Sequence, residues 1–435
     1  MNKFLGYTCS ICGTEYLPEQ VVYTCPKDGG NLDVRVDEEL IRRKYRPEDI
    51  TSRADTSIWR YLPLLPVSTP SGSATPLHMV GGTPVYGLPN REEAGATSFV
   101  WLKDESRNPT GSLKDRASAV VVARALDLAG PGGKPPVIVT ASTGNAGAAL
   151  AGMAAAAGQE AVILAPKSAP PAKIAQLLIF GAKVLLVDGT YDDAFDLSVK
   201  AAEEFGWYCR NTGYNPFTAE GKKTAAFEIW EWYLATLATG KRVNVSSGST
   251  GFRSAGLTVF VSVGDGNIIS GLHKGFKDLL ALGWLEQMPR LIGVQAVGSA
   301  AIAEAFRAGT DKIMPLKAKT LADSISVDLP RDGIRALRAV RESSGMFVTV
   351  SDNEILKALA ALGRLGIFAE PAGAAAYAGL LTAQAHGWLD PESTVLVLNT
   401  GSGLKDVSAA MQAVALGAGP APIIEPTLEA LKKYL

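Results

Sequence analysis

One lysine stands directly after a run of helix-breaking residues. The segment "NPTGSLKDRA", residues 108–117, places proline, glycine and small polar residues before Lys114. Those residue types favour a turn, whereas the residues after the lysine can form a helix. A lysine amine becomes a nucleophile when a partly desolvated pocket keeps it deprotonated. Lys114 is therefore a candidate for covalent chemistry, although the charged run "KDR" alone is typical of a solvated surface.

Three glycine-containing loops each follow a predicted strand: "TASTGNAG" (140–147), "VGDGNI" (263–268) and "LNTGSGLKD" (398–406). Backbone amides at a helix N-terminus bind carboxylates or phosphates, and glycines let a loop close around a phosphate. Neither a Walker motif nor the G-x-G-x-x-G fingerprint is present, which argues against a nucleotide-binding protein. A phosphate loop, a carboxylate site and a reactive lysine together predict pyridoxal phosphate as the cofactor.

The elements that must position these loops alternate between strand and helix. Apolar, β-branched runs at 135–140, 160–166, 257–263 and 393–400 predict buried parallel strands, with helical segments between them. Such alternation predicts an α/β fold with a mostly parallel sheet covered on both faces. Ligands bind such sheets beyond the carboxyl ends of the strands, where the three loops lie.

The lysine segment resembles the lysine motif of threonine synthases, which are fold-type II pyridoxal-phosphate enzymes. Further segments have counterparts in that family in the same order: "GGTPVYGLP", "TASTGNAG", "NPFTAEGKKTAAFEI", "VGDGNIISG", "TLADSISV", "EPAGAAAYAGL" and "NTGSGLKD". The resemblance covers nearly the whole chain. It implies a two-lobed enzyme with mostly parallel, twisted sheets. The expected parts are a zinc-ribbon-like knuckle (1–40), a large cofactor-binding lobe (41–117 and 216–435) and a small lobe (118–215).

The resemblance also implies roles for single residues. Lys114 would hold the cofactor as an imine and move protons at the substrate's α and neighbouring carbons. Asn145 would donate to the cofactor's 3′-oxygen, and Thr400 would face its pyridine nitrogen. Ser142 and Thr143 would take the substrate carboxylate. The cofactor phosphate would be surrounded by Gly264, Asp265, Gly266, Asn267 and Ile268.

The reaction implied is conversion of O-phosphohomoserine and water to threonine and phosphate. Many threonine synthases have arginine at the position of Thr218 and glutamine at that of Lys222, and a substrate phosphate needs cationic partners. Lys222 is therefore predicted to bind the substrate phosphate, so that its loss leaves the cofactor colour intact; Lys223 and Arg116 are neighbouring candidates. Alternatives are β-replacement on O-phosphoserine, deamination of a hydroxyamino acid, or a non-catalytic binding protein on the same fold.

The N-terminal segment carries a different pattern. Cys9 and Cys12 form a C-x2-C pair, and Cys25 with Asp28 repeats its spacing. Two such pairs form closed tetrahedral zinc sites, so a structural zinc with three cysteines and one aspartate is one interpretation. The alternative interpretation is a ribbon fold without a metal. In both interpretations Cys209, which lies far away in the sequence, is a buried thiol and not a ligand. The apolar cluster expected in the knuckle is Tyr7, Tyr16, Val22 and Leu32.

The composition and net charge limit the kinds of molecule that this protein is expected to bind. The 435 residues carry a net charge of −1, so nothing attracts this protein to nucleic acid or to an anionic membrane. The N-terminus lacks the apolar run of a signal peptide, so a cytoplasmic enzyme acting on a small amino-acid substrate is expected. We also expect a homodimer. Residues 244–256, rich in serine and glycine, are predicted to be an inserted, flexible surface loop.

Overall fold

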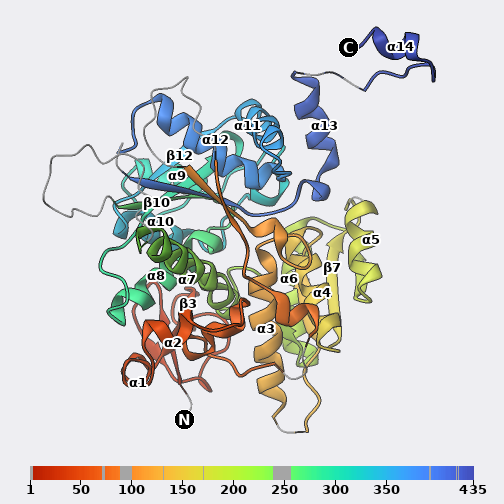
Figure 1. The fold of residues 1–435 in the computed structure, drawn as a ribbon. Coiled ribbons are helices and arrows are strands. Elements are labelled where there is room, and N and C mark those ends of the chain that lie inside the picture. The colour runs from red at the N-terminus through yellow and green to blue at the C-terminus, as the bar shows by residue number, and fades with distance from the viewer. Residues whose placement is uncertain are drawn as a thin grey trace, which may run out of the picture.

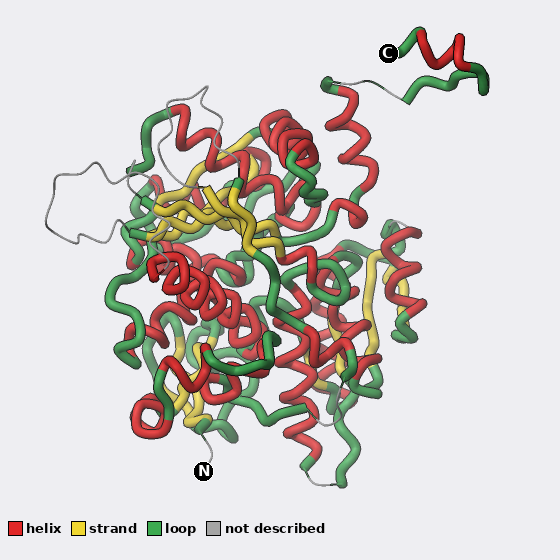
Figure 2. The backbone as a smooth tube through the Cα atoms, in the orientation of Figure 1, coloured by secondary structure: helices red, strands yellow, loops and turns green. Residues whose placement is uncertain are grey.

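The computed structural model contains two sheets and a small N-terminal knuckle (Figures 1 and 2). The structure describes residues 3–70, 74–88, 100–130, 132–169, 171–238, 256–390, 393–417, 419 and 421–435. Apart from its last residue, the predicted insertion at 244–256 lies outside these ranges. None of the described helices is long and apolar enough to cross a membrane.

The larger sheet has six strands in the order β12-β11-β10-β13-β5-β4. All neighbours are parallel except the edge pair β4 and β5. Figure 2 shows helices on both sides of this sheet. Successive residues of a strand point to opposite faces, so β10 and β13 contribute to two separate cores, as the uninterrupted apolar runs predicted. The bounds are β4 Val85–Gly87, β5 Val100–Asp104, β10 Leu257–Ser262, β11 Arg290–Ala296, β12 Met346–Val350 and β13 Thr394–Asn399.

The smaller sheet has four parallel strands in the order β8-β7-β6-β9. Its strands are β6 Ile138–Ala141, β7 Ala161–Pro166, β8 Lys183–Val187 and β9 Tyr208–Cys209. Its helices are α4 Asn145–Ala156, α5 Pro171–Ile179 and α6 Tyr191–Phe205. All of these elements fall within the range predicted for the small lobe. The division of the chain into lobes itself stays a prediction.

Three long helices connect the two sheets: α3 (Lys114–Ala129), α7 (Phe217–Ala238) and α8 (Asn267–Ala281). Glycines permit the close approach of α7 and α8, since a Cβ on Gly271 would lie 2.7 Å from Lys222 Cβ. The remaining helices are α1 Glu38–Lys44, α2 Pro47–Thr51, α9 Ala301–Arg307, α10 Gly333–Glu342, α11 Asp352–Arg364, α12 Pro371–Ala385, α13 Val407–Ala415 and α14 Leu428–Lys432. Short 3-10 helices span Ile58–Leu64, Pro76–Met79, Glu105–Arg107, Val297–Ser299, Asp323–Ile325 and Gly403–Lys405.

A buried ionic network fixes the start of α3. The Arg116 guanidinium donates to Glu105 at 2.7 and 2.8 Å and to Glu228 at 2.8 and 2.7 Å, and Lys103 also donates to Glu228 at 2.7 Å. Burial alone would raise the pKa of Glu228, but Arg116 and Lys103 overcome it and lower that pKa. The network joins the end of β5 to α3 and α7. Arg116 is thus fully engaged in the scaffold, which corrects its candidacy as a cation for the substrate.

The N-terminal knuckle is a three-stranded antiparallel sheet in the order β2-β1-β3. Its strands are β1 Phe4–Cys9, β2 Glu15–Tyr16 and β3 Leu32–Val36. Tyr7 and Leu32 are buried as predicted, but Val22 is 52% exposed and Val21 occupies the core in its place. The predicted cluster was therefore wrong by one residue, because no periodic pattern marks which side chain of this irregular loop points inward.

Candidate active site

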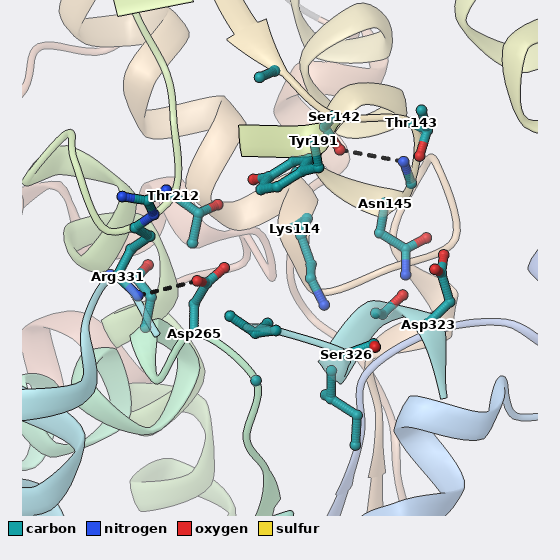
Figure 3. Close-up of a pocket in the computed structure, with 18 of the residues that line it drawn as sticks. Lys114, Ser142, Thr143, Asn145, Tyr191, Thr212, Asp265, Asp323, Ser326 and Arg331 are labelled. Atoms are coloured by element: carbon teal, nitrogen blue, oxygen red, sulfur yellow. Dashed lines mark hydrogen bonds between the residues drawn. The ribbon is translucent and has the colours of Figure 1, made fainter. Parts of the chain in front are cut away.

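A cavity of about 510 Å³ lies where the carboxyl ends of β6, β10 and β13 face the start of α3. Figure 3 shows Lys114, Asn145 and Asp265 pointing into it from three different segments of the chain. All of the residues predicted to bind cofactor or substrate line it: Lys114, Ser142, Thr143, Asn145, Lys222, Gly264, Asp265, Gly266, Asn267, Ile268 and Thr400. The predicted metal ligands do not line it; they lie in the knuckle.

Lys114 is the first residue of α3, and the preceding turn aims it at the cavity. Gly111 has φ +86°, which favours glycine. The Thr110 amide donates to Asp115 at 2.6 Å, and the Leu113 amide donates to the Thr400 carbonyl at 3.0 Å. Burial lowers the pKa of the Lys114 amine, and the nearby Glu370 carboxylate only partly opposes this. The amine is therefore neutral more often than an ordinary lysine, as nucleophilic attack requires.

Glu370 is a site residue that sequence reasoning missed. It precedes α12 and is buried, and Asn145 Nδ2 donates to both of its carboxylate oxygens at 2.8 Å. Burial raises the pKa of Glu370, while Lys114 opposes that shift. The glutamate of "EPAGAAAYAGL" was a visible signal, because a carboxylate before an apolar helix is costly to bury unless the site uses it.

The loop after β10 forms an anion-binding turn at the N-terminus of α8. Gly266 caps the helix with φ +95°, and a Cβ there would lie 2.7 Å from the Asp332 carbonyl oxygen. A Cβ on Gly264 would lie 2.9 Å from Ile325 Cα. Both glycines are therefore required by packing, and they leave the first amides of a 15-residue helix facing the cavity.

Asn267, the first residue of α8, is held from behind by charged groups. Its Nδ2 donates to Asp332 at 2.7 Å, and Arg335 binds both carboxylate oxygens of Asp332 at 2.6 and 2.8 Å. Its Oδ1 accepts from the Lys222 ammonium. Burial is the main cause that lowers the pKa of Lys222 well below its usual value, followed by repulsion from Arg210 and from Lys114. Lys222, on α7, therefore contacts the anion-binding turn through Asn267.

The two neighbouring residues of the same motif do not face the cavity. Lys223 forms buried ion pairs with Asp278, at 2.8 Å, and with Glu220. Thr218 is buried, and its hydroxyl donates to the Asn215 carbonyl at 2.7 Å. These contacts correct the sequence-based candidacy of Lys223 as a phosphate ligand. They also show that Thr218 fills a packed position.

Three buried oxygen atoms indicate whether the cavity can accept a polar heteroaromatic cofactor. Asn145 Oδ1, Ser262 Oγ and Thr400 Oγ1 have no hydrogen-bond partner within the described part of the chain. Buried polar atoms are normally paired, so atoms of this kind lining a cavity are available to a polar ligand. The Lys114 amine, the Ser262 and Thr400 hydroxyls and the anion-binding turn match an aldehyde, a ring nitrogen and a phosphate, and Asn145 Oδ1 can accept from a protonated ring hydroxyl. The residues therefore fit pyridoxal phosphate.

Comparison with known proteins agrees with this fit. The family model for "Pyridoxal-phosphate dependent enzyme" matches residues 77–401. A threonine synthase of Methanocaldococcus jannaschii is 36% identical over 411 residues, which cover 93% of this chain and 94% of the relative. One of Mycobacterium tuberculosis is 35% identical and covers 78% of this chain and 86% of the relative. The chain belongs to the threonine synthase family of pyridoxal-phosphate-dependent enzymes. It is thus an enzyme, and the predicted cofactor is confirmed.

Solved structures of other enzymes share the fold of this chain. A threonine deaminase of T.th. has a TM-score of 0.57 and 25% sequence identity, covering 74% of this chain and 92% of that one. Maize serine racemase has a TM-score of 0.58 and 22% identity, covering 74% and 88%. These likenesses confirm the predicted fold-type II architecture.

Proposed function

We propose that this enzyme converts O-phosphohomoserine and water to threonine and phosphate in the cavity at Lys114. The observation that carries the proposal is a buried, pKa-lowered lysine amine facing the N-terminal amides of α8. That pairing suits a cofactor with an aldehyde at one end and a phosphate at the other. The identity to threonine synthases over most of the chain supports the reaction.

Each residue at the cavity has a role in this proposal. When bound, pyridoxal phosphate supplies an electron sink for charge that develops next to the substrate's amino group. Lys114 holds the cofactor and moves protons at the α-carbon and its neighbours. Thr400 Oγ1 accepts or donates at the ring nitrogen without a full charge, which limits the sink. Asn145 orients the ring through its 3′-oxygen, and Ser142 and Thr143 at the start of α4 bind the substrate carboxylate.

The cofactor phosphate binds at the turn formed by Gly264, Asp265, Gly266, Asn267 and Ile268. We assign Lys222 to this phosphate, because its ammonium contacts Asn267 of that turn. This assignment differs from the role predicted from sequence, in which Lys222 served the substrate phosphate. A dianion beside a buried ammonium favours its charged form and so offsets the desolvation that lowers its pKa.

The substrate phosphate then needs other cations. Lys173 and Arg331 line the cavity, paired with Asp323 and Asp192 respectively. Both carboxylates are more than half exposed, and ion pairs of that kind contribute only about 0–1 kcal/mol. A phosphate dianion can displace them. We propose that these two cations stabilise the departing phosphate, in place of the arginine that Thr218 replaces.

The test is to incubate the holoenzyme with O-phosphohomoserine and to measure phosphate and threonine in the same samples. Equal amounts of both products, absent with Lys114→Ala, support the proposal. Parallel incubations with O-phosphoserine plus a sulfur nucleophile, and with threonine or serine, cover the alternative substrates. Turnover of one of those with no phosphate released from O-phosphohomoserine would replace this function by β-replacement or deamination.

A further inference from the structure

The N-terminal knuckle contains two turns of the same construction. In the first, Gly13 has φ +69° and its amide donates to the Cys9 carbonyl at 3.1 Å. In the second, Gly29 has φ +70° and its amide donates to the Cys25 carbonyl at 2.8 Å. The residue before each of these glycines therefore occupies an equivalent position. The first turn presents two thiols from C-x2-C, and the second presents a thiol and a carboxylate from C-x2-D.

The side chains of the two turns converge on one point. Their ligand atoms, from Cys9, Cys12, Cys25 and Asp28, all lie within 4.8 Å of one another. Cys12 Sγ lies 3.8 Å from Cys25 Sγ, and Cys9 Sγ lies 3.3 Å from Asp28 Oδ1. Zinc–sulfur bonds of about 2.3 Å place two ligands of a tetrahedron about 3.8 Å apart, whereas a disulfide holds its sulfurs at about 2.0 Å. The spacing is that of ligands around a cation.

The surroundings prepare these groups to be ligands. The Ile11 amide donates to Cys9 Sγ at 3.3 Å, and the Gly30 amide donates to Asp28 Oδ1 at 2.9 Å. Such outer hydrogen bonds orient metal ligands and stabilise thiolates. A Cβ on Gly30 would lie 2.9 Å from both Cys9 Sγ and Asp28 Oδ1, so glycine keeps the space between the ligands open. The knuckle's short three-stranded sheet offers little core of its own, as in small domains that a metal stabilises.

We propose that Cys9, Cys12, Cys25 and Asp28 bind one Zn²⁺ in a closed, structural, tetrahedral site. The metal stabilises the knuckle against the body of the enzyme rather than taking part in the reaction. From the knuckle, Asp33 accepts from Arg335 at 2.8 Å, and Arg335 also binds Asp332, which holds Asn267. The ordered knuckle thus supports the helix that lies behind the phosphate turn.

The experiment measures metal bound to the full-length protein after dialysis against metal-free buffer. We expect about one zinc per chain in the wild type and in Cys209→Ser, whose thiol is buried on β9 and is not part of the four-residue cluster. Cys12→Ser should weaken zinc binding at least about 100-fold, since loss of a mere outer partner costs about 10–100-fold. Retention of zinc by Cys12→Ser at wild-type affinity would overturn the proposal.

Cobalt provides a readout on the wild-type protein, which does not depend on whether a variant folds. The Co²⁺-loaded wild type should show thiolate-to-cobalt charge transfer and the intense d–d bands of tetrahedral geometry. Asp28→Cys should retain the metal and raise the charge-transfer intensity by one further thiolate's share. An octahedral cobalt spectrum in the wild type, or a disulfide in place of the free Cys12 and Cys25 thiols in denatured, unreduced protein, would refute the site.

Discussion

Replacing Lys222 by methionine distinguishes between the two proposed roles of its ammonium, which are binding of the cofactor phosphate and binding of the substrate phosphate. Methionine has a similar length but no charge, so it removes the contact with Asn267 while filling the space. A hydrogen bond from a charged donor contributes about 1.5–3 kcal/mol. At about 1.4 kcal/mol for each tenfold, the dissociation constant for pyridoxal phosphate should rise about 10–100-fold. The cofactor-free variant should unfold at higher temperature than the wild type, because the buried Lys222 cation forms no ion pair with the described carboxylates and so destabilises the wild type.

The assay is a spectroscopic titration of cofactor-free protein with pyridoxal phosphate. Lys223→Met is the matched control, since that side chain is as deeply buried but pairs with Asp278 and Glu220 outside the cavity. It should lower the free energy of unfolding and leave cofactor affinity unchanged. If Lys222→Met bound the cofactor with wild-type affinity while turnover of O-phosphohomoserine fell, the assignment to the cofactor phosphate would be wrong and the original one, to the substrate phosphate, correct.

Further consequences follow at four positions. Lys114→Ala should lose the yellow colour and turnover, and borohydride should fix the cofactor to Lys114 in the wild type, as peptide mass spectrometry can show. Gly266→Ala should weaken cofactor binding about tenfold or more, because an L residue at positive φ costs about 1–2 kcal/mol and the added Cβ would meet the Asp332 carbonyl. Gly283→Ala, at φ +72° with open space around it, is the control in the same cofactor titration. Because the pKa of Lys222 is lowered in the folded state, the unfolded chain binds more protons than the folded one at pH values between the folded pKa and 10.5. The stability of the wild type relative to Lys222→Met should therefore rise with pH in that window. Thermal melts of the cofactor-free proteins measure this difference. Glu228→Gln should lower the free energy of unfolding by about 3–5 kcal/mol in denaturant titrations, because it leaves Arg116 buried with a weakened partner.

The sequence predicted the strands and the loops that line the cavity because both depend on local patterns. The runs that became β6, β10 and β13 are apolar and β-branched, and their loops are marked by glycine and by Asn145 or Thr400. Parallel strands place such loops at the carboxyl edge of each sheet, and the loops of the two sheets meet at the cavity. The homodimer and the cytoplasmic location stay predictions from the sequence.

The contacts of charged groups could not be predicted in the same way. Lys222 reaches Asn267 because glycines on α8 allow α7 to approach it closely, which is a property of tertiary packing. Arg116 and Lys222 are both fully buried cations, yet Arg116 belongs to an ionic network and Lys222 lines the cavity. Glu370 joins Asn145 across more than two hundred residues of sequence, so no local pattern indicates that pair.

The most direct test of the central claim incubates the enzyme with O-phosphohomoserine in ¹⁸O-labelled water and analyses both products by mass spectrometry. The proposed reaction breaks the carbon–oxygen bond and adds water at the β-carbon. It predicts one labelled oxygen in threonine and none in the released phosphate. Labelled phosphate together with homoserine would mean hydrolysis at phosphorus, and would contradict the account of this cavity as the site of threonine formation.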